Sequence, residues 1–167
     1  MTRIKKCLQF LIPFFTGICV TVLLNFFCFD VHVVNGSSMS MALYDGDVVI
    51  AQKMFMNDID RGDIVILKDT RLNQLMIKRV IGLPGETIQF DEEGYTYIDG
   101  EKLSYEYQFP TVGMIYDYDN VTLDDNEYFV AGDNRYDSYD SRYFGPVERQ
   151  NIRSIAIFRL FPFEICR

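Results

Sequence analysis

Residues 75–83 read LMIKRVIGL, and the run stops at Pro84 and Gly85. The stretch is rich in long and β-branched apolar residues, and Pro-Gly is a strong turn signal, so we expect a β-strand that ends there. Lys78 lies in the middle of this strand with apolar neighbours on both faces. A cation in such a place indicates either a functional lysine or a lysine whose ammonium reaches back to water.

Short apolar runs separated by turn residues continue along the chain after Val31, and no long stretch there has helical periodicity. The expected strands are Asp47–Lys53, Asp63–Lys68, Leu75–Leu83, Thr87–Phe90, Tyr95–Ile98, Tyr128–Ala131 and Ile152–Leu160. One short helical turn is expected at Met39–Asp45. The even spacing of the strands predicts a mostly β domain, either a barrel or a sandwich.

The composition excludes several classes of function. The chain of 167 residues has a net charge of −8, whereas nucleic-acid binding needs clustered basic residues. His32 is the only histidine, and the four cysteines lack C-x-x-C spacing. We therefore expect no nucleic-acid partner, no metal and no cofactor. The stretch Tyr116–Glu127, YDYDNVTLDDNE, lacks the spacing of an EF-hand and is interpreted as a solvated acidic loop.

The start of the chain predicts a membrane anchor. Residues 1–7 form a basic tip, and residues 8–29 contain no charge over a length that would span roughly 33 Å as a helix. A cleavable signal would have a shorter apolar region and small residues at its cleavage site. Because the basic residues precede the apolar run, we expect a single-pass protein of the cell membrane. Its N-terminus would be cytoplasmic, and residues 30–167 would form the extracellular domain.

A serine nucleophile needs a base, and lysine is the main candidate here. His32 follows the apolar run closely and is interpreted as a polar residue at the membrane boundary, since a Ser-His-Asp triad would require it to fold back into the site. Lys78 fits best, because burial among apolar groups lowers a lysine pKa from about 10.4 toward neutrality. Lys53 and Lys68 end their apolar runs and are expected to be exposed.

Two polar segments are candidates for the rest of the site. Residues 35–40, NGSSMS, form either a tight loop whose N–H groups converge as in an oxyanion hole, or a flexible linker. Residues 132–146, GDNRYDSYDSRYFGP, form either a solvated loop or a rigid network beside the site. The candidate ion pairs there are Asp133–Arg135 and Asp140–Arg142. Ser138 is placed to hydrogen-bond a neighbouring base.

Together these segments resemble type I signal peptidase, the Ser/Lys leader peptidase of bacteria. The serine box is matched by Gly36-Ser37-Ser38-Met39 with Leu43, Gly46, Asp47 and Val49, and a following strand by Arg61–Val65, RGDIV. The lysine box is matched by Lys78–Glu86, KRVIGLPGE, and the last box by Gly132–Arg142, GDNRYDSYDSR. The resemblance extends from the anchor to about Pro146. The short interval between Gly85 and Gly132 resembles the Gram-positive form with one membrane span.

The resemblance implies an antiparallel β domain of two sheets and a role for each matched residue. Ser38 would be the nucleophile, Lys78 the neutral general base, and Ser138 the residue that orients the lysine. The supporting residues would be Asp140 and Arg142 as an ion pair, Asp133 and Arg135 in the loop, and Gly36, Ser37 and Met39 around the oxyanion and substrate. The substrates would be exported preproteins cut after small residues at −1 and −3, with a pilin as one possibility.

Some features depart from this family. Met41 and Ala42 stand where Pro and Thr are usual, so a looser nucleophile loop is expected. Gly36 stands where some members carry an oxyanion-assisting serine. A second interpretation is an accessory protein of pilus or surface-fibre assembly that acts by binding, although such members generally lack the Ser or the Lys. A repressor-type autoprotease would need a DNA-binding N-terminus, where this chain has the apolar run.

Overall fold

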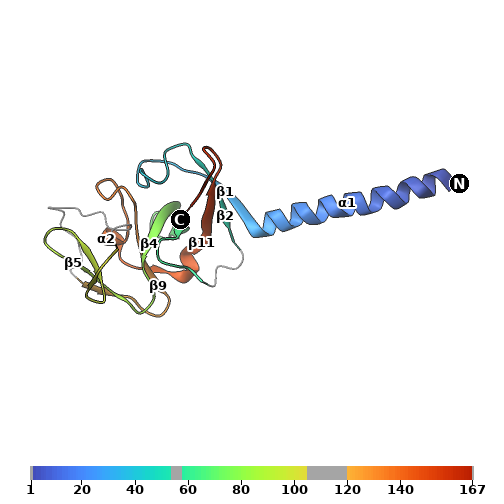
Figure 1. Ribbon diagram of the computed structural model, residues 1–167. Helices are drawn as coiled ribbons and strands as arrows, with labels where there is room; N and C mark the ends of the chain where they lie inside the picture. The colour runs from blue at the N-terminus through green and yellow to red at the C-terminus, as the bar shows by residue number, and fades with distance from the viewer. Residues whose placement is uncertain (1, 54–57, 105–119, 167) are drawn as a thin grey trace.

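A long N-terminal helix, α1 (Thr2–Cys28), projects from a body built of β-strands (Figure 1). The computed structural model describes residues 2–53, 58–104 and 120–166. The helix contains Pro13, and the Thr16 and Thr21 hydroxyls donate to carbonyls one turn earlier. Within these described ranges, no helix has both the length and the mean hydropathy needed to cross a membrane. Phe29, which the sequence analysis placed at the end of the apolar segment, is the first residue of β1.

The larger sheet is antiparallel and contains eight of the described strands. Its order is β1-β2-β11-β3-β4-β9-β10, and β12 pairs with β11. The strands are β1 (Phe29–Val33), β2 (Val48–Gln52), β3 (Ile64–Asp69), β4 (Gln74–Gly82), β9 (Glu127–Ala131), β10 (Val147–Glu148), β11 (Ile152–Arg159) and β12 (Glu164–Ile165). Two short helices, α2 (Ser141–Phe144) and the 3-10 helix η2 (Arg149–Asn151), flank β10.

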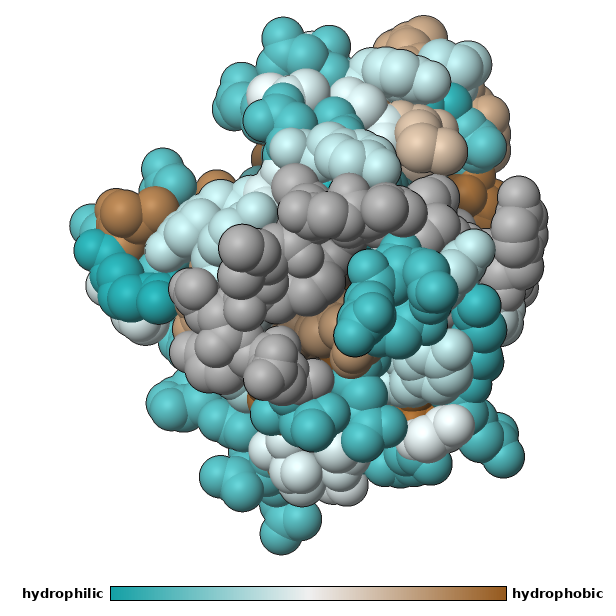
Figure 2. Space-filling view, turned by 90° about the vertical axis from the view of Figure 1, so that its left-hand side faces the viewer, coloured by the Kyte–Doolittle hydropathy of each residue, from teal (hydrophilic) through white to brown (hydrophobic). Residues whose placement is uncertain are grey.

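A smaller antiparallel sheet of four described strands lies at the end of the body away from α1 (Figure 1). Its order is β7-β6-β5-β8. The strands are β5 (Thr87–Phe90), β6 (Thr96–Ile98), β7 (Glu101–Lys102) and β8 (Asn120–Thr122). Figure 2 shows this end of the molecule, where most of the described surface is hydrophilic. The prediction of a mostly β domain with antiparallel sheets is confirmed.

The seven expected strands are all present, with ends that differ by one residue or not at all. The acidic stretch was predicted less well. Its residues 116–119 lie outside the described residues, but Asn120–Thr122 form β8, which pairs with β5. The interpretation of a solvated loop is wrong there because Val121 is buried against Ile88 and the neighbouring core residues. At Met39–Asp45 the expected helical turn is present, with the Leu43 N–H donating to the Met39 carbonyl at 2.8 Å.

The two sheets are joined by one cluster of buried apolar residues. The large sheet contributes side chains from β4 and β9, and the small sheet contributes side chains from β5, β6, β8 and the loops beside them. The cluster comprises Ile81, Ile88, Ile98, Leu103, Val121, Leu123, Phe129 and Ala131. Full burial of each large aliphatic or aromatic side chain stabilises the fold by about 1.5–3 kcal/mol. This cluster therefore holds the last residues of β4, and with them the whole strand, in a fixed place.

Gly82, at the end of β4, packs closely against side chains from both sheets. A Cβ atom built there would lie 2.5 Å from Ile88 Cδ1 and 3.0 Å from both Leu123 Cδ1 and Phe129 Cβ. Real side chains do not approach as closely as 2.5 Å, so a larger residue would have to displace the end of the Ile88 side chain and crowd Leu123 and Phe129.

We expect Gly82→Ala to lower the free energy of unfolding by about 1–3 kcal/mol, as overpacking of a core usually does. The measurement is urea unfolding of the detergent-solubilised chain. Ile88→Val removes the nearest methyl group and serves as the matched variant. The double variant Gly82→Ala/Ile88→Val should lose less than the sum of the two single losses. Equal unfolding midpoints for Gly82→Ala and the natural chain would show that the contact is absent.

Candidate active site

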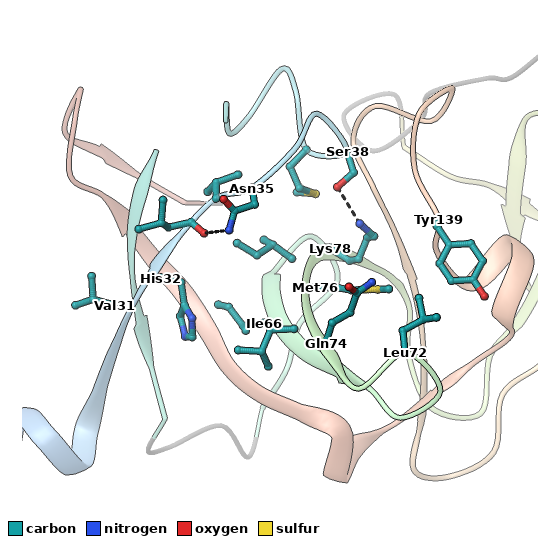
Figure 3. Close-up of a pocket in the computed structure, with 15 residues that line it drawn as sticks. Val31, His32, Asn35, Ser38, Ile66, Leu72, Gln74, Met76, Lys78 and Tyr139 are labelled. Carbon is teal, nitrogen blue, oxygen red and sulfur yellow. Dashed lines mark hydrogen bonds between the residues drawn. The ribbon is translucent and has the colours of Figure 1, made fainter. Parts of the chain in front are cut away.

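Ser38 and Lys78 meet at one end of a groove, with Lys78 Nζ 2.9 Å from Ser38 Oγ (Figure 3). Lys78 lies in the middle of β4, opposite Val65 of β3, and is 4% exposed. Ser38 lies in the loop that follows β1. The strand positions the amine because β4 is anchored by its full pairing with β3 on one side and by the inter-sheet core at its end.

The protonation of Lys78 is governed mainly by its burial. Removal from water disfavours the ammonium form and lowers the pKa of Lys78 below its usual value. Asp140 and Asp133 raise this pKa, Arg142 lowers it, and burial outweighs the carboxylates. The amine is therefore prepared to accept a proton from the neighbouring hydroxyl.

The nucleophile loop is fixed by its own backbone and by carboxylates at its base. The Gly36 N–H donates to Asp45 Oδ1 at 2.7 Å, and Gly36 adopts a φ of 90°, which favours glycine. The Ser37 hydroxyl bonds to the Asp137 carboxylate. Met39 is 1% exposed and packs in the core under the loop. These contacts make residues 36–39 an ordered turn and not a flexible linker.

A second loop, residues 132–138, packs directly on the nucleophile loop. The Asn134 N–H donates to the Ser38 carbonyl at 3.0 Å, and Asn134 Nδ2 donates to the Ser37 carbonyl at 3.2 Å. A Cβ on Gly132 would lie 2.4 Å from the Ser38 carbonyl oxygen, so only glycine permits this approach. Asn134 lies within the predicted motif, but its role could not be predicted because nothing local indicates a partner so far away in the chain.

Asp140 and Arg142 form the expected ion pair, completely buried. Arg142 Nε and Nη2 each donate to the Asp140 carboxylate at 2.8 Å, and the Gly132 N–H donates to it at 2.9 Å. Burial by itself would raise the pKa of Asp140, but the hydrogen bonds and charge of Arg142 outweigh it and hold this pKa low. The carboxylate thus stays ionised and keeps the loop attached to the end of β9.

The expected pairing of Asp133 with Arg135 is wrong. Arg79 Nε and Nη2 donate to the Asp133 carboxylate at 2.8 and 2.7 Å. The Arg135 Nε donates instead to the Gly132 carbonyl at 2.9 Å. The physical reason is strand register, because Arg79 lies opposite Ala131, the last residue of β9, and so reaches Asp133 two residues later. Arg135 remains a support of the loop, as the sequence analysis expected of it, through a backbone contact.

Ser138 is buried beside the site without a bond to the lysine. Its Oγ has no hydrogen-bond partner among the described residues. It lies close enough to Asp140 to contribute to the low pKa of that carboxyl, from a position outside hydrogen-bond geometry. The orientation of Lys78 by Ser138 therefore stays a prediction.

Arg159, at the end of β11, holds in place the part of the nucleophile loop, residues 41 and 42, that differs from the family pattern. Its Nη1 donates to the Ala42 carbonyl at 3.0 Å and to Asp47 Oδ2 at 3.3 Å. Met41 is 68% exposed and has a φ of 104°, a strained value for a residue with a side chain. The arginine holds the loop from a strand that the sequence pattern did not connect to it. The looser nucleophile loop stays a prediction.

The other basic candidates are not positioned to act on Ser38. Lys53 Nζ bonds to Asp30 Oδ1 at 3.0 Å, and Lys68 is half-buried on β3. His32 lines the same groove as Ser38, but no hydrogen bond joins the two residues in the described part of the chain. Within that part, no group of three or more His, Cys, Asp or Glu side chains is placed to hold a metal ion.

The groove has a volume of about 900 Å³ and runs between β1 and the first half of β4 (Figure 3). It is lined by 31–35, Ser38, Met39, Ile66, Leu72, 74–78 and Tyr139. Among the described strands, β1 pairs only with β2, and residues 74–78 of β4 pair only with β3. Two strand edges are thus free along the groove, which is the geometry that accepts an extended peptide as an added strand.

Comparison with known proteins gives a consistent result. Residues 7–161 match the family described as "Signal peptidase, peptidase S26". The chain is 34% identical to Signal peptidase I of Bacillus licheniformis, over 90% of this chain and 87% of that protein. It is 33% identical to Signal peptidase I T of Bacillus subtilis, over 90% and 83%. A crystal structure of a signal peptidase I from Enterococcus faecalis is similar with a TM-score of 0.49 and 32% identity, over 59% of this chain and 97% of that one.

The burial of Lys78 predicts a pH-dependent stability. Between the lowered pKa of the folded chain and the ordinary value of 10.5, the unfolded chain binds a proton that the folded chain does not. The free energy of unfolding therefore rises as the pH rises through this window and levels off above 10.5. Lys78→Met should remove this contribution. The variant should therefore be more stable than the natural chain at lower pH, and the difference in the free energy of unfolding should shrink as the pH rises.

Urea unfolding at a series of pH values measures this difference. Lys68→Met removes a lysine from β3 and controls for the loss of one charge. The measured quantity is the difference in the free energy of unfolding between Lys78→Met and the natural chain. If this difference stayed constant across the pH window, it would contradict the lowered pKa of Lys78.

Proposed function

Because the chain belongs to the signal peptidase family, peptidase S26, we propose that it is a membrane-anchored endopeptidase that uses Ser38 as nucleophile and Lys78 as general base. The chain is a serine peptidase of the type I signal peptidase kind. Its substrates are exported preproteins, from which it removes the signal peptide. The observation that carries the assignment of the dyad is the 2.9 Å contact between the buried Lys78 amine and the Ser38 hydroxyl.

The dyad supports acyl transfer in two steps. Neutral Lys78 takes the proton of Ser38 as Oγ attacks the scissile carbonyl carbon, and a tetrahedral oxyanion forms. The resulting ammonium then gives the proton to the departing amine as the peptide bond breaks, leaving an acyl-serine. In the second step Lys78 takes a proton from water, the hydroxide attacks the acyl carbon, and the proton returns to Ser38 Oγ as the acid product leaves.

The nucleophile loop supports stabilisation of the oxyanion. In the described structure the Ser38 N–H donates no hydrogen bond to another group, so it is available to the developing negative charge. Gly36 and Ser37 flank this position in an ordered turn, and the Ser37 hydroxyl is engaged with Asp137. A donor preorganised by the turn is worth about 10²–10³ in rate in comparable sites.

The free edges of β1 and β4 support binding of the preprotein in an extended form. Backbone hydrogen bonds would hold the peptide between residues 31–33 and 74–78, and alternate side chains would point into the groove. Met39 and Ile77 line the groove together with Ser38. Restricted space beside the nucleophile would favour small residues at −1 and −3. A pilin with such residues is one member of this substrate class.

The helix α1 supports attachment to a lipid bilayer. Its described side chains between 11 and 23 are uncharged and exposed. Exposed apolar side chains continue from α1 onto β1, at Phe29, Val31 and Val33, and others lie around β12, at Phe163 and Ile165. With the basic residues on the N-terminal side, the cytoplasmic end precedes the span and the catalytic domain lies outside. The groove then opens close to the membrane surface, where a signal peptide ends.

The accessory-protein interpretation is not favoured. Both reactive residues are present, and the lysine is buried at hydrogen-bond distance from the serine. A binding role would not need a lysine buried beside a serine, because burial of an amine costs stability.

We expect Ser38→Ala and Lys78→Ala to lower the cleavage rate of a preprotein in detergent by at least about 10³-fold, because the two groups act as one unit. The rate of the natural chain should rise with pH as Lys78 loses its proton. Lys53→Ala, which removes a lysine bonded to Asp30, is the matched control and should cut at the natural rate. If Lys78→Ala cut at a rate similar to that of the natural chain, the assignment of Lys78 as the base would be rejected. If the natural chain cut no preprotein, the proposed enzymatic function would be rejected.

The anchor is tested on the full chain by fractionating cells and washing the membranes with alkaline carbonate. We expect the protein to stay in the membrane pellet. Ile18→Lys places a charge at the centre of the apolar run, which costs about 2.5–3.5 kcal/mol for insertion, and should release part of the protein. Extraction of the natural chain by carbonate would contradict a membrane-spanning helix.

A further inference from the structure

Tyr139 presents an accessible aromatic ring to the groove that leads to Ser38. Its side chain lines the groove and the residue is 46% exposed. It is the only tyrosine or phenylalanine among the described residues that line the groove. Figure 3 shows the ring on the side away from β1, in the part of the groove that also contains Leu72 and Met76. A bound peptide can therefore reach this ring.

The ring of Tyr139 is held in a fixed place by its surroundings. Its neighbours in the chain, Ser138 and Asp140, are both buried. The ring stacks on Tyr143 of α2, with centroids 6.0 Å apart and an angle of 25° between the planes. It also meets Phe144 edge-on, at 5.3 Å and 68°. Because the ring is already ordered, little conformational entropy is lost when a side chain binds against it.

The two faces of β4 present different walls to a peptide in the groove. Neighbouring residues of a strand point to opposite faces. Ile77 packs against the apolar cluster under the nucleophile loop, which contains Met39. Met76 and Phe144 pack against the other apolar cluster of the large sheet. Since Tyr139 packs against Phe144, its ring belongs to the wall on the Met76 face.

A peptide that pairs with the free edge of β4 alternates its side chains between these two walls. In the proposed function, small side chains at −1 and −3 point to the wall that contains Met39. The side chain at −2 then points to the other wall, where Leu72, Met76 and Tyr139 line the groove. The residue before Met76 on the same face of β4 is Gln74, which is exposed and polar. A side chain at −4 would therefore meet no comparable apolar wall.

We propose that Tyr139 is a specificity-determining residue, which selects preproteins with a large apolar or aromatic side chain at −2. The inference rests on the proposed function and deepens it. A large side chain at −2 would cover the exposed surfaces of Tyr139 and Leu72, which is 53% exposed, and remove them from water. An aromatic side chain would also pack favourably against the ring of Tyr139. Ala at −2 would leave both surfaces in water.

The experiment measures the cleavage of preproteins by the full chain in detergent, with Phe or Ala at −2, −3, −4 and +1. The measured quantity is the ratio of kcat/KM for Phe over Ala at each position. We expect the natural chain to prefer Phe at −2 by roughly tenfold, because the groove is open and covers only part of the side chain. Tyr139→Ala should bring this ratio close to one, and Tyr139→Phe, which keeps the ring, should retain it.

Two further variants complete the design. Tyr44→Ala removes an exposed tyrosine that does not line the groove, so this matched control should leave the ratio at −2 unchanged. If Tyr139→Ala does not fold, Tyr139→Leu replaces it, because leucine keeps an apolar contact with Phe144 but lacks the ring. We expect Tyr139→Leu to lower the ratio about threefold, the size of one aromatic pair.

Two results would overturn the inference. One is a Phe-to-Ala ratio at −2 that is the same in Tyr139→Ala and in the natural chain. An equal loss on all preproteins, which a merely structural role of Tyr139 would cause, leaves the ratio unchanged and is included in this result. The other is a preference that depends on Tyr139 at −3, −4 or +1 instead of −2.

Binding separates the inference from the proposed function. Fluorescent peptides with Phe or Ala at −2 are titrated into Ser38→Ala and into the double variant Ser38→Ala/Tyr139→Ala. A preference for Phe that the second substitution abolishes, together with an inert natural chain, would support the inference and reject the proposed function. Equal binding of the two peptides to Ser38→Ala, together with cleavage by the natural chain at equal kcat/KM, would reject the inference and leave the proposed function intact.

Discussion

The site is built around one constraint. The buried amine of Lys78 has a hydroxyl, and not a carboxylate, as its hydrogen-bonded neighbour. Two carboxylates, Asp140 and Asp133, are near enough to raise the pKa of Lys78. Each is held by an arginine through two hydrogen bonds, Asp140 by Arg142 and Asp133 by Arg79. The arginines engage the acids that would otherwise pair with the lysine and stabilise its charged form. Burial then dominates, and the amine stays available as a base.

The same ion pairs position the backbone around the amine. Asp140 accepts from the Gly132 N–H, and the absence of a side chain at Gly132 lets this loop reach the Ser38 carbonyl. Asn134 completes the contact from the same loop, and Arg159 holds the other end of the nucleophile loop through the Ala42 carbonyl. Three segments that are distant in sequence, residues 36–42, residues 132–140 and the end of β11, are therefore held together by hydrogen bonds to main-chain atoms. Such bonds tolerate variation in the side chains of the loop, including Met41 and Ala42.

An interaction could be predicted from the sequence when its partners are close together in the chain, and not when they are far apart. Alternating and apolar runs are local, so the strands were predicted closely, including the one that carries Lys78. The partner of Asp133 depends on strand register, and the local choice of Arg135 was wrong because Arg79 comes from the neighbouring strand. β1 was missed because its five residues directly follow a long apolar run, and β8 because one buried valine lies among acidic residues. Asn134 and Arg159 were missed because both act on backbone atoms far away in the chain.

Unpaired strand edges lie along the groove that leads to Ser38. Within the described chain, β1 pairs only with β2, and residues 74–78 of β4 pair only with β3, although free edges invite unwanted pairing. A fold stabilised elsewhere by well-packed clusters and paired charges thus leaves backbone groups unpaired where a peptide would enter. An extended chain bound there would pair with these edges, so that binding and alignment of the scissile bond with Ser38 become a single event.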